Sequence, residues 1–462
     1  MSITAPNEPT APSTPPVQDR AIFTRGSVLR HVLVMTSTGS IGLISVFLVD
    51  FLSLLYVSRL GDPNLTAGVG YASQILFVVI SVNIGLSIAV SALVARQLGA
   101  NNRPAAERLS ASGLTQVMII GALVALPIVI WRVEILERIG ATGAVLDTAS
   151  LFLMISLPAN FLMAGGMALS GILRAVGDAK RSMYITLIGA LVTAVLDPVL
   201  IFGFHLGVTG AAITTVVSRL VWMIVGIRGA VYVHKLVAWP RAKAVLSDLA
   251  PIMTIALPVI LTNIAAPVAN IYTMRIFSEF GSEVIAAFAI IDRVTPVAFG
   301  VLFAMSSAVG PIVSQNYGAK LFPRVRDTLT SCYAVAGAYV ALVWAALFFG
   351  SHAIVSLFGA QGETAALVIF FCNWGATAWF FLGCIFTANA AFNNLGFPVL
   401  STVFNWGRAT LGTIPFVTLG AKFWGPTGGL MGIVAGAALF GGFAVMTSYW
   451  ATTRLASRAQ LS

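Results

Sequence analysis

The sequence predicts an all-α membrane protein in which twelve transmembrane helices form two pseudo-symmetric six-helix bundles. The first observation is composition: 58% of the 462 residues are hydrophobic and only 9% are charged, against about 25% charged residues in soluble proteins. The second is a series of apolar runs, each long enough to cross a bilayer. The third is a repeat that relates the two halves of the chain. No stretch of mixed polarity is long enough to form a soluble domain.

The first 20 residues are rich in Pro, Thr, Ser and Ala, and we assign residues 1–24 to an N-terminal tail. A cleavable signal peptide needs a compact apolar run between a basic start and a small-residue cleavage site. This segment has no such run, so we expect a disordered cytoplasmic tail. Insertion into the membrane then depends on the first span itself.

A membrane span needs about 20 apolar residues, and the chain has twelve such runs. They cover residues 32–57, 65–93, 111–131, 149–171, 184–204, 208–227, 250–277, 284–313, 329–350, 364–390, 399–420 and 428–450. We assign residues 25–228 to an N-terminal bundle, 229–248 to a polar, basic cytoplasmic linker and 249–455 to a C-terminal bundle.

Loop charges predict the orientation of the spans. The N-terminal tail, the even-to-odd loops and the C-terminus together carry 18 Lys and Arg residues, and the opposite loops carry five. Because positive charge collects on the cytoplasmic side, we expect both termini there. The same rule accounts for the net charge of +10, so a nucleic-acid partner is not expected.

A repeat relates the two halves of the chain. Gly99 recurs as Gly318, and Gly177 recurs as Gly396, both at an offset of 219 residues. Six spans per half is an even number, so the halves have the same orientation and an axis along the membrane normal relates them. Two such bundles with a cleft between them are typical of a rocker-type secondary transporter.

Two membrane carboxyls are the strongest candidates for function. Asp50 and Asp197 precede the outer ends of spans 1 and 5 by nine and eight residues, which places both about 12–14 Å below the outer boundary. An unpaired charge at the centre of a membrane helix costs roughly 2.5–3.5 kcal/mol. We therefore expect a shared site for protons and substrate, with helix–helix bonding as the structural alternative. The repeat replaces Asp50 by Asn270.

Other polar residues could support this site. Pro198 frees the carbonyl of Ala194 beside Asp197, and several hydroxyls and amides lie in the neighbouring spans. A possible second site consists of Asp292 and Arg293 in span 8, for which a structural role is equally open. The supporting candidates are Thr193, Pro198, Thr214, Thr215, Asn160 and Asn270.

Metal and enzyme chemistry find little support in the sequence. The three cysteines lie in apolar segments without metal-ligand spacing, and the four histidines are scattered. No nucleophile–base pair is present, which argues against an enzyme. Arg219 and Arg408, near mid-span, suit structural partners or cavity walls. The aromatic residues of span 10, including Trp379, would suit flat cations if they line the cleft.

Several motifs occur in a specific order along these spans. The loop after span 2 reads Val94-Ala-Arg-Gln-Leu-Gly-Ala100, and its copy reads Gln315-Asn-Tyr-Gly-Ala319. Spans 4 to 6 contain Leu173-Arg-Ala-Val-Gly-Asp-Ala-Lys180, Leu196-Asp-Pro198 and Gly207-Val-Thr-Gly-Ala-Ala212. With these motifs, the chain resembles the multidrug and toxic compound extrusion (MATE) family over residues 25–455.

The resemblance implies efflux of organic cations in exchange for protons or sodium ions. The DinF-like prokaryotic branch carries acids in helices 1 and 5, which match Asp50 and Asp197. The NorM-like branch also uses a Glu in helix 7 and an Asp in helix 10, and neither is present within those spans here. The sequence therefore resembles the DinF-like branch.

We expect a monomeric, multi-pass antiporter of the bacterial inner membrane that exports amphipathic, cationic drugs or toxic compounds in exchange for protons. Sodium is the alternative coupling ion, and no further cofactor is expected. A second hypothesis is a flippase for lipids or lipid-linked oligosaccharides, which would line the cleft with basic residues. A channel or membrane scaffold is a third hypothesis, and it predicts no saturable exchange.

Overall fold

A computed structural model describes residues 21–461, and all regular secondary structure in the described chain is helical. The helices of the first half are α1 (Val28–Ser58), α2 (Pro63–Gly99), α3 (Arg103–Ile130), α4 (Arg132–Arg138), α5 (Gly143–Ser156), α6 (Asn160–Val176), α7 (Ala179–Pro198) and α8 (Gly207–Ile227). Those that follow are α9 (Ala242–Ser247), α10 (Leu249–Ser278), α11 (Ser282–Gly318), α12 (Phe322–Phe358), α13 (Gly362–Asn373), α14 (Ala378–Leu395), α15 (Pro398–Gly407) and α16 (Ile414–Leu461).

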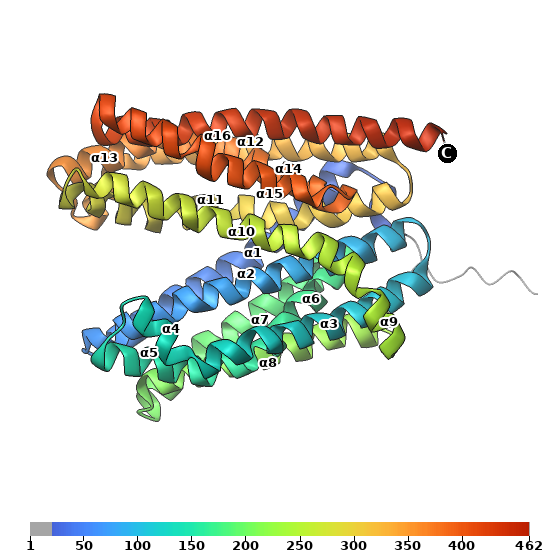
Figure 1. Cartoon of the computed structure of the whole chain (residues 1–462), viewed down its shortest axis with the longest axis horizontal. Helices are drawn as coiled ribbons and strands as arrows, with labels where there is room; N and C mark the ends of the chain where they lie inside the picture. Colours follow the sequence, from blue (N-terminus) through green and yellow to red (C-terminus); the bar gives the residue numbers. More distant parts are fainter. Residues whose placement is uncertain (1–20, 462) are drawn as a thin grey trace, which may run out of the picture.

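Figure 1 shows the helices of the first half packed into one bundle and those of the second half packed above it. Both ends of the described chain lie at the same end of the molecule, which we call the termini side. The opposite end, with the turns at Gly61 and Gly281, is the far side. The short segment with α9 passes between the bundles on the termini side, and the boundaries 229–248 stay our proposal for the division into domains.

The described chain contains eleven helical segments that are long and apolar enough to cross a membrane. The last of them, Pro398–Gln460, is 63 residues long and is interrupted by non-helical backbone at Trp424 and Gly425. It therefore divides into two crossings, which makes twelve in all. The predicted all-α membrane fold is confirmed.

Two predicted spans differ from continuous helices. Leu157–Ala159 forms a 3-10 turn between α5 and α6, where Pro158 lacks the N–H that a helix requires. Gly375–Thr377 forms a second 3-10 turn between α13 and α14. There a side chain at Gly375 would meet the ring of Phe371 at 2.8 Å. The two breaks occupy corresponding places in the two halves.

The repeat is also visible in the backbone. Gly177 and Gly396 both end helices in the left-handed region, with φ of 94° and 92°. Asn101 and Lys320, also separated by 219 residues, have φ of 57° and 58° although neither is glycine. Such matched values at a constant offset show that the two halves share one local geometry.

The halves meet most closely on the termini side, where α2 crosses α11. A methyl group at Gly99 would collide with the carbonyl oxygen of Gln315, and one at Gly318 would collide with the carbonyl oxygen of Arg96. Gln315 is the repeat equivalent of Arg96. The two contacts are therefore the same contact seen from each half.

At this crossing, one polar side chain from each half also donates a hydrogen bond to the backbone of the other half. Arg96 Nη2 donates to the carbonyl of Asn394 at 2.9 Å, and Gln315 Nε2 donates to the carbonyl of Ala175 at 2.6 Å. Asn394 and Ala175 are themselves repeat equivalents. The guanidinium of Arg96 also lies 4.8 Å from the ring centroid of Tyr317. Each half thus holds the other by one long polar side chain.

The segment before α1 differs from the predicted disordered tail. Residues 1–20 lie outside the described residues, but Ile22–Thr24 forms a 3-10 turn with Phe23 buried. The amide of Phe23 donates to Gln315 Oε1 at 2.9 Å, and Arg324 Nη2 donates to the Phe23 carbonyl at 2.8 Å. The Phe23 ring also packs beside Gly177. Because its ring is buried and its backbone groups are hydrogen-bonded, Phe23 is ordered. The composition of the N-terminal segment gives no indication of this order.

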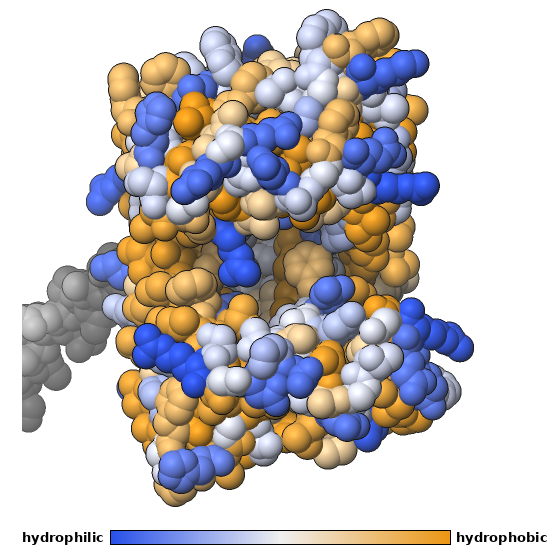
Figure 2. Space-filling view, turned by 90° about the vertical axis from the view of Figure 1, so that its left-hand side faces the viewer, coloured by the Kyte–Doolittle hydropathy of each residue, from blue (hydrophilic) through white to orange (hydrophobic). Residues whose placement is uncertain are grey.

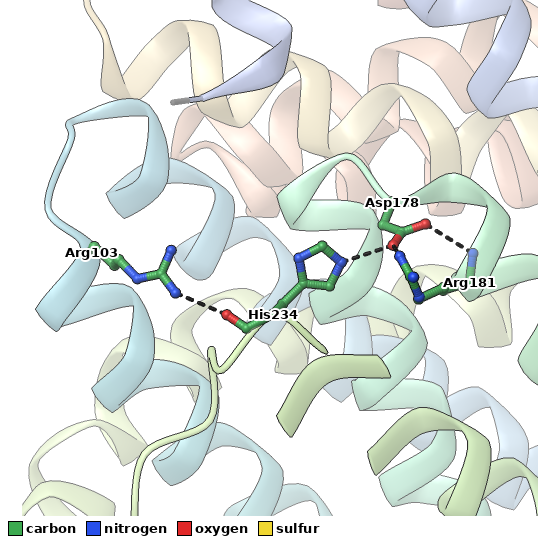
Figure 3. A network of polar contacts seen from close by, with 4 residues as sticks. All are labelled: Arg103, Asp178, Arg181 and His234. Carbon is green, nitrogen blue, oxygen red and sulfur yellow. Dashed lines mark hydrogen bonds and ion pairs between the residues drawn. The ribbon is translucent and has the colours of Figure 1, made fainter. Parts of the chain in front are cut away.

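A polar network ties the start of the linker to the first half (Figure 3). His234 Nε2 contacts Asp178 Oδ2 at 2.8 Å, and Arg181 pairs with the same carboxylate. Arg103 Nη2 donates to the carbonyl of His234 at 2.8 Å. Burial opposes ionisation, but the hydrogen bonds from His234 and Arg181 hold the pKa of Asp178 below its usual range.

Candidate substrate and ion site

A cleft separates the two halves on the far side. Figure 2 views the molecule from that side and shows a deep hollow between the upper and lower halves, with hydrophilic and apolar side chains on its walls. Where the halves remain in contact, α1 packs against α11 and α10 packs against α2. The molecule is therefore closed on the termini side and open on the far side.

Asp197 lies at the end of α7, in the first half. Its side chain is buried, with 1% of its surface exposed, and the hydroxyl of Ser53 donates to Oδ2. Thr214 of α8 is buried as well, but its hydroxyl donates to the carbonyl of Gly210 at 3.0 Å. Oδ1 has no hydrogen-bond partner in the described chain. A buried carboxyl with hydroxyl neighbours and a free oxygen can bind a proton or a small cation.

Asp50 lies in α1, one helical turn before Ser53. Its side chain is exposed, and Ser53, whose hydroxyl donates to Asp197, follows it on the same helix. A charged residue that is exposed within a spanning helix normally faces a water-filled cavity, which places Asp50 on the wall of the cleft. The two acids therefore lie near one another, one within the bundle and one at its surface.

The predicted supporting residues divide into two groups. Pro198 ends α7, and a π-helical turn, Val199–Gly203, follows it beside Asp197. Thr193 and Thr215 instead donate to carbonyls of their own helices. Asn160 is bound within the core, where it accepts from Asn83 at 2.9 Å. In the described chain, these last three residues form no hydrogen bond with either acid and instead stabilise the helices around them.

The residues proposed for the second half lie at the surface. Asp292 and Arg293 are both exposed on α11, and Asn270 is exposed on α10. Within residues 21–461, neither Asp292 nor Arg293 forms an ion pair. The second half therefore has charged residues at the level of the spans but no buried carboxyl like Asp197.

The two mid-span arginines differ in their surroundings. Arg219 is buried in the first half and donates to the carbonyl of Ser156, next to the break between α5 and α6. That interaction satisfies backbone at the end of a helix, which is a structural role. Arg408 begins a π-helical turn, and its Nε has no partner in the described chain.

The aromatic residues of the second half mostly pack against one another. Trp379 stacks on Phe299 with 4.8 Å between ring centroids and 6° between planes, so one face of the indole is already occupied. Phe380 and Phe381 line an apolar pocket of about 290 Å³ together with residues of α12. No three His, Cys, Asp or Glu side chains gather as metal ligands in the part of the chain described.

Ser53 is the site residue that the sequence reading misses. It lies eleven residues after Gly42, and eleven residues are close to three full helical turns. Gly42 contacts the side chain of Thr186 on α7, so Ser53 lies on the same α7-facing side of α1. Because the packing of Gly42 is visible only in the structure, the sequence alone carries no signal for the contact between Ser53 and Asp197.

A family profile described as MatE matches residues 40–199 and 258–419, one match in each half. Among curated relatives, the FAD transporter of Shewanella oneidensis is 26% identical over 430 residues, covering 90% of this chain and 93% of the relative. The multidrug export protein MepA of Staphylococcus aureus is 22% identical over 409 residues, covering 86% of each chain.

Solved structures share the fold. A multidrug resistance MATE family transporter of the MOP superfamily in an outward-facing conformation superposes with a TM-score of 0.87 at 20% identity, covering 94% of this chain and 98% of that one. A Vibrio cholerae MATE transporter superposes with a TM-score of 0.86 at 21% identity, covering 92% and 96%. At these identities the likeness concerns the fold.

Proposed function

Because this chain belongs to the MATE family of transporters, we propose that it is a bacterial inner-membrane antiporter that exports amphipathic, cationic small molecules in exchange for protons. A member of this transporter family is not an enzyme. We further propose that it belongs to the DinF-like branch, since its two membrane acids of the first half have no counterparts in the second. Asp50 and Asp197 would form the coupling site.

The observation that carries the proposal is that Asp197 is buried beside Ser53 of α1, while Asp50 lies exposed one helical turn before Ser53. Removal from water favours the neutral form of a carboxyl, so a proton-loaded site would carry no net charge within the membrane. A cationic substrate would favour the ionised site instead. Proton and substrate would then compete, and exchange follows if only a loaded transporter reorients.

The name of one relative supports a drug-like substrate, and the name of another supports an aromatic anion. MepA is a multidrug export protein, and the Shewanella protein transports FAD. Both names are compatible with a cleft that accepts planar or amphipathic molecules. We propose small organic molecules as the substrates of this chain, with the lipid bilayer as the only other partner and a monomer as the working unit.

The proposed orientation places the termini side in the cytoplasm. The basic residues there include Arg103, Arg181 and Arg324, which suits the positive-inside rule. The cleft of Figure 2 would then face the outside of the cell, as expected for a state that has released its substrate and awaits a proton.

The test is efflux of a cationic dye from proteoliposomes under separately imposed pH and sodium gradients. We expect a pH gradient alone to drive uphill dye movement and a sodium gradient alone to have no effect. Transport driven only by sodium would contradict proton coupling. Scrambling of fluorescent lipids with no dye transport would favour the flippase, and unsaturable leakage would favour a channel.

A further inference from the structure

The contact between α1 and α11 sets the level of residues on the cleft walls. Gly39 of α1 packs against Ala304 of α11, and Gly300 packs against Ile44. Since the two helices run in opposite directions, residue numbers rise along α1 and fall along α11 towards the far side. Asp50 lies eleven residues beyond Gly39, and Arg293 lies eleven residues before Ala304.

Eleven residues are about three helical turns and about 16 Å of rise. Both residues therefore return to the helix face on which Gly39 and Ala304 meet, at the same level above that contact. The α11 helix is continuous through Pro296 between these levels. Asp50 and Arg293 thus lie opposite each other, one on each wall of the cleft.

Both side chains are exposed, and neither forms an ion pair in the part of the chain described. Arg293 also makes no hydrogen bond or ring contact there. A charged residue within a membrane span normally faces a water-filled cavity or the bundle interior. The guanidinium of Arg293 is therefore available to a ligand in the cleft.

The repeat provides an internal comparison. Asn263 of α10 contacts the carbonyl of Ser81 in α2 at 3.5 Å, and seven residues further towards the far side lie Asn270 and Gln74. These are the repeat equivalents of Asp50 and Arg293, and both are exposed. One edge of the cleft thus carries an acid and a base, while the symmetric edge carries two neutral amides.

We propose that Arg293 binds the anionic group of a substrate whose cationic group is bound at Asp50, so that the cleft selects amphoteric molecules. The inference rests on the proposed transport function and specifies its substrate class. A guanidinium offers a planar fork of donors that matches a carboxylate or phosphate. A ligand with opposite charges at its two ends would pair with both Asp50 and Arg293 and leave neither charge unpaired.

The experiment compares two dyes that differ only in their negative charge. One is a xanthene dye with cationic amines and a free benzoate, and the other is the methyl ester of the same dye. Binding is measured by fluorescence anisotropy on the purified full-length protein in detergent, and transport is measured separately in proteoliposomes. The variants are Arg293→Gln, Arg293→Lys and Gln74→Ala.

We expect Arg293→Gln to raise the Kd of the free acid by at least about tenfold, as the loss of a charge-assisted hydrogen bond implies, while the Kd of the ester changes little. Arg293→Lys should recover part of the difference, and Gln74→Ala should leave the ratio of the two constants unchanged. Asp50→Asn should weaken both dyes, because both carry the cation.

Equal effects of Arg293→Gln on the two dyes, or no effect on either, would overturn the inference, as would a wild-type protein that binds neither dye. Failure of the proposed antiport has a different signature. In that case the dyes would bind with the expected discrimination, but no ion gradient would drive their transport in proteoliposomes.

Discussion

Gly99 and Gly318 occupy the same position in the two halves, and each lies against the backbone of the other's helix where α2 crosses α11. The pseudo-twofold axis therefore passes beside this pair. No other residue type fits, because a single methyl group on either residue would overlap a carbonyl oxygen of the opposite helix. The crossing closes the termini side while the far side stays open.

The first prediction concerns this crossing. Gly99→Ala and Gly318→Ala should each force α2 and α11 apart and destabilise the observed state by about 1–3 kcal/mol, the range for overpacking. Because the contacts are symmetric, the two variants should have similar effects. The measurement is the labelling rate of a cysteine introduced at Asn270 by an impermeant maleimide, which should fall as the far side closes more often.

Gly70→Ala is the matched control for these variants. Gly70 lies in the same helix as Gly99, but a side chain there would meet nothing within 4 Å. Its labelling rate should equal that of the parent protein. A similar decrease in the control would show that helix propensity, rather than the crossing, controls the conformation.

A second prediction concerns the two acids. Asp50→Asn and Asp197→Asn should each reduce proton-driven efflux to background, because an amide cannot exchange a proton at these positions. Both variants should remain monodisperse in detergent, since an amide preserves most of the shape of a carboxyl. If either variant instead unfolds, the structural role is the correct interpretation for that residue.

The third prediction concerns Asn270, which occupies in the second half the position that Asp50 occupies in the first. Asn270→Asp restores an acid at the repeat equivalent of Asp50, yet it should not create a second coupling site. No buried acid takes the place of Asp197 there, because that position falls at Pro415 or Phe416. The variant should show the parent's ratio of protons to substrate, and a doubled ratio would contradict the proposal.

The fourth prediction is a pH dependence of stability. Asp178 has its pKa held below the usual range by His234 and Arg181, so its ionised form stabilises the fold above the unfolded value of about 3.9. That stabilisation is lost as the pH falls through the lower pKa of the folded state. Asp178→Asn should therefore reduce the free energy of unfolding by roughly 1 kcal/mol, since the pair with Arg181 is partly exposed.

Thermal unfolding in detergent across a pH series checks this expectation. The difference between the parent and Asp178→Asn should be constant from neutral pH to about pH 5 and should shrink below about pH 4. Asp147→Asn, at a carboxyl of α5 with no ion pair in the described chain, serves as the control. A difference that grows on acidification would contradict the stated direction.

The repeat shows what the sequence can and cannot predict. Gly99 and Gly318 are identifiable as equivalents from their offset, and so is the twelve-span fold. Their mutual contact is not predictable, because it depends on how the two bundles pack around their axis. Similarly, a composition-based reading assigns Phe23 to a disordered tail, since the niche that buries it is formed by residues almost 300 positions away, including Gln315.

The candidate site was predictable in its acids but not in its hydroxyls. Depth within the spans brings Asp50 and Asp197 to one level, because helical rise converts sequence distance into height. Serine and threonine in membrane helices often bond to their own backbone, as Ser45 does to Ile41. Only the three-dimensional arrangement separates Ser53, which reaches Asp197, from Thr193, which does not.

The ordered segment around Phe23 has a practical consequence for handling the protein. Arg324 donates to the carbonyls of Phe23 and Gly26, so this short segment acts as a staple between the start of α1 and the opposite bundle. A truncation that removes residues 21–26 would release the staple and alter the balance of conformations in any assay. Affinity tags and fluorescent fusions are therefore better placed after α16, at the carboxyl end of the chain.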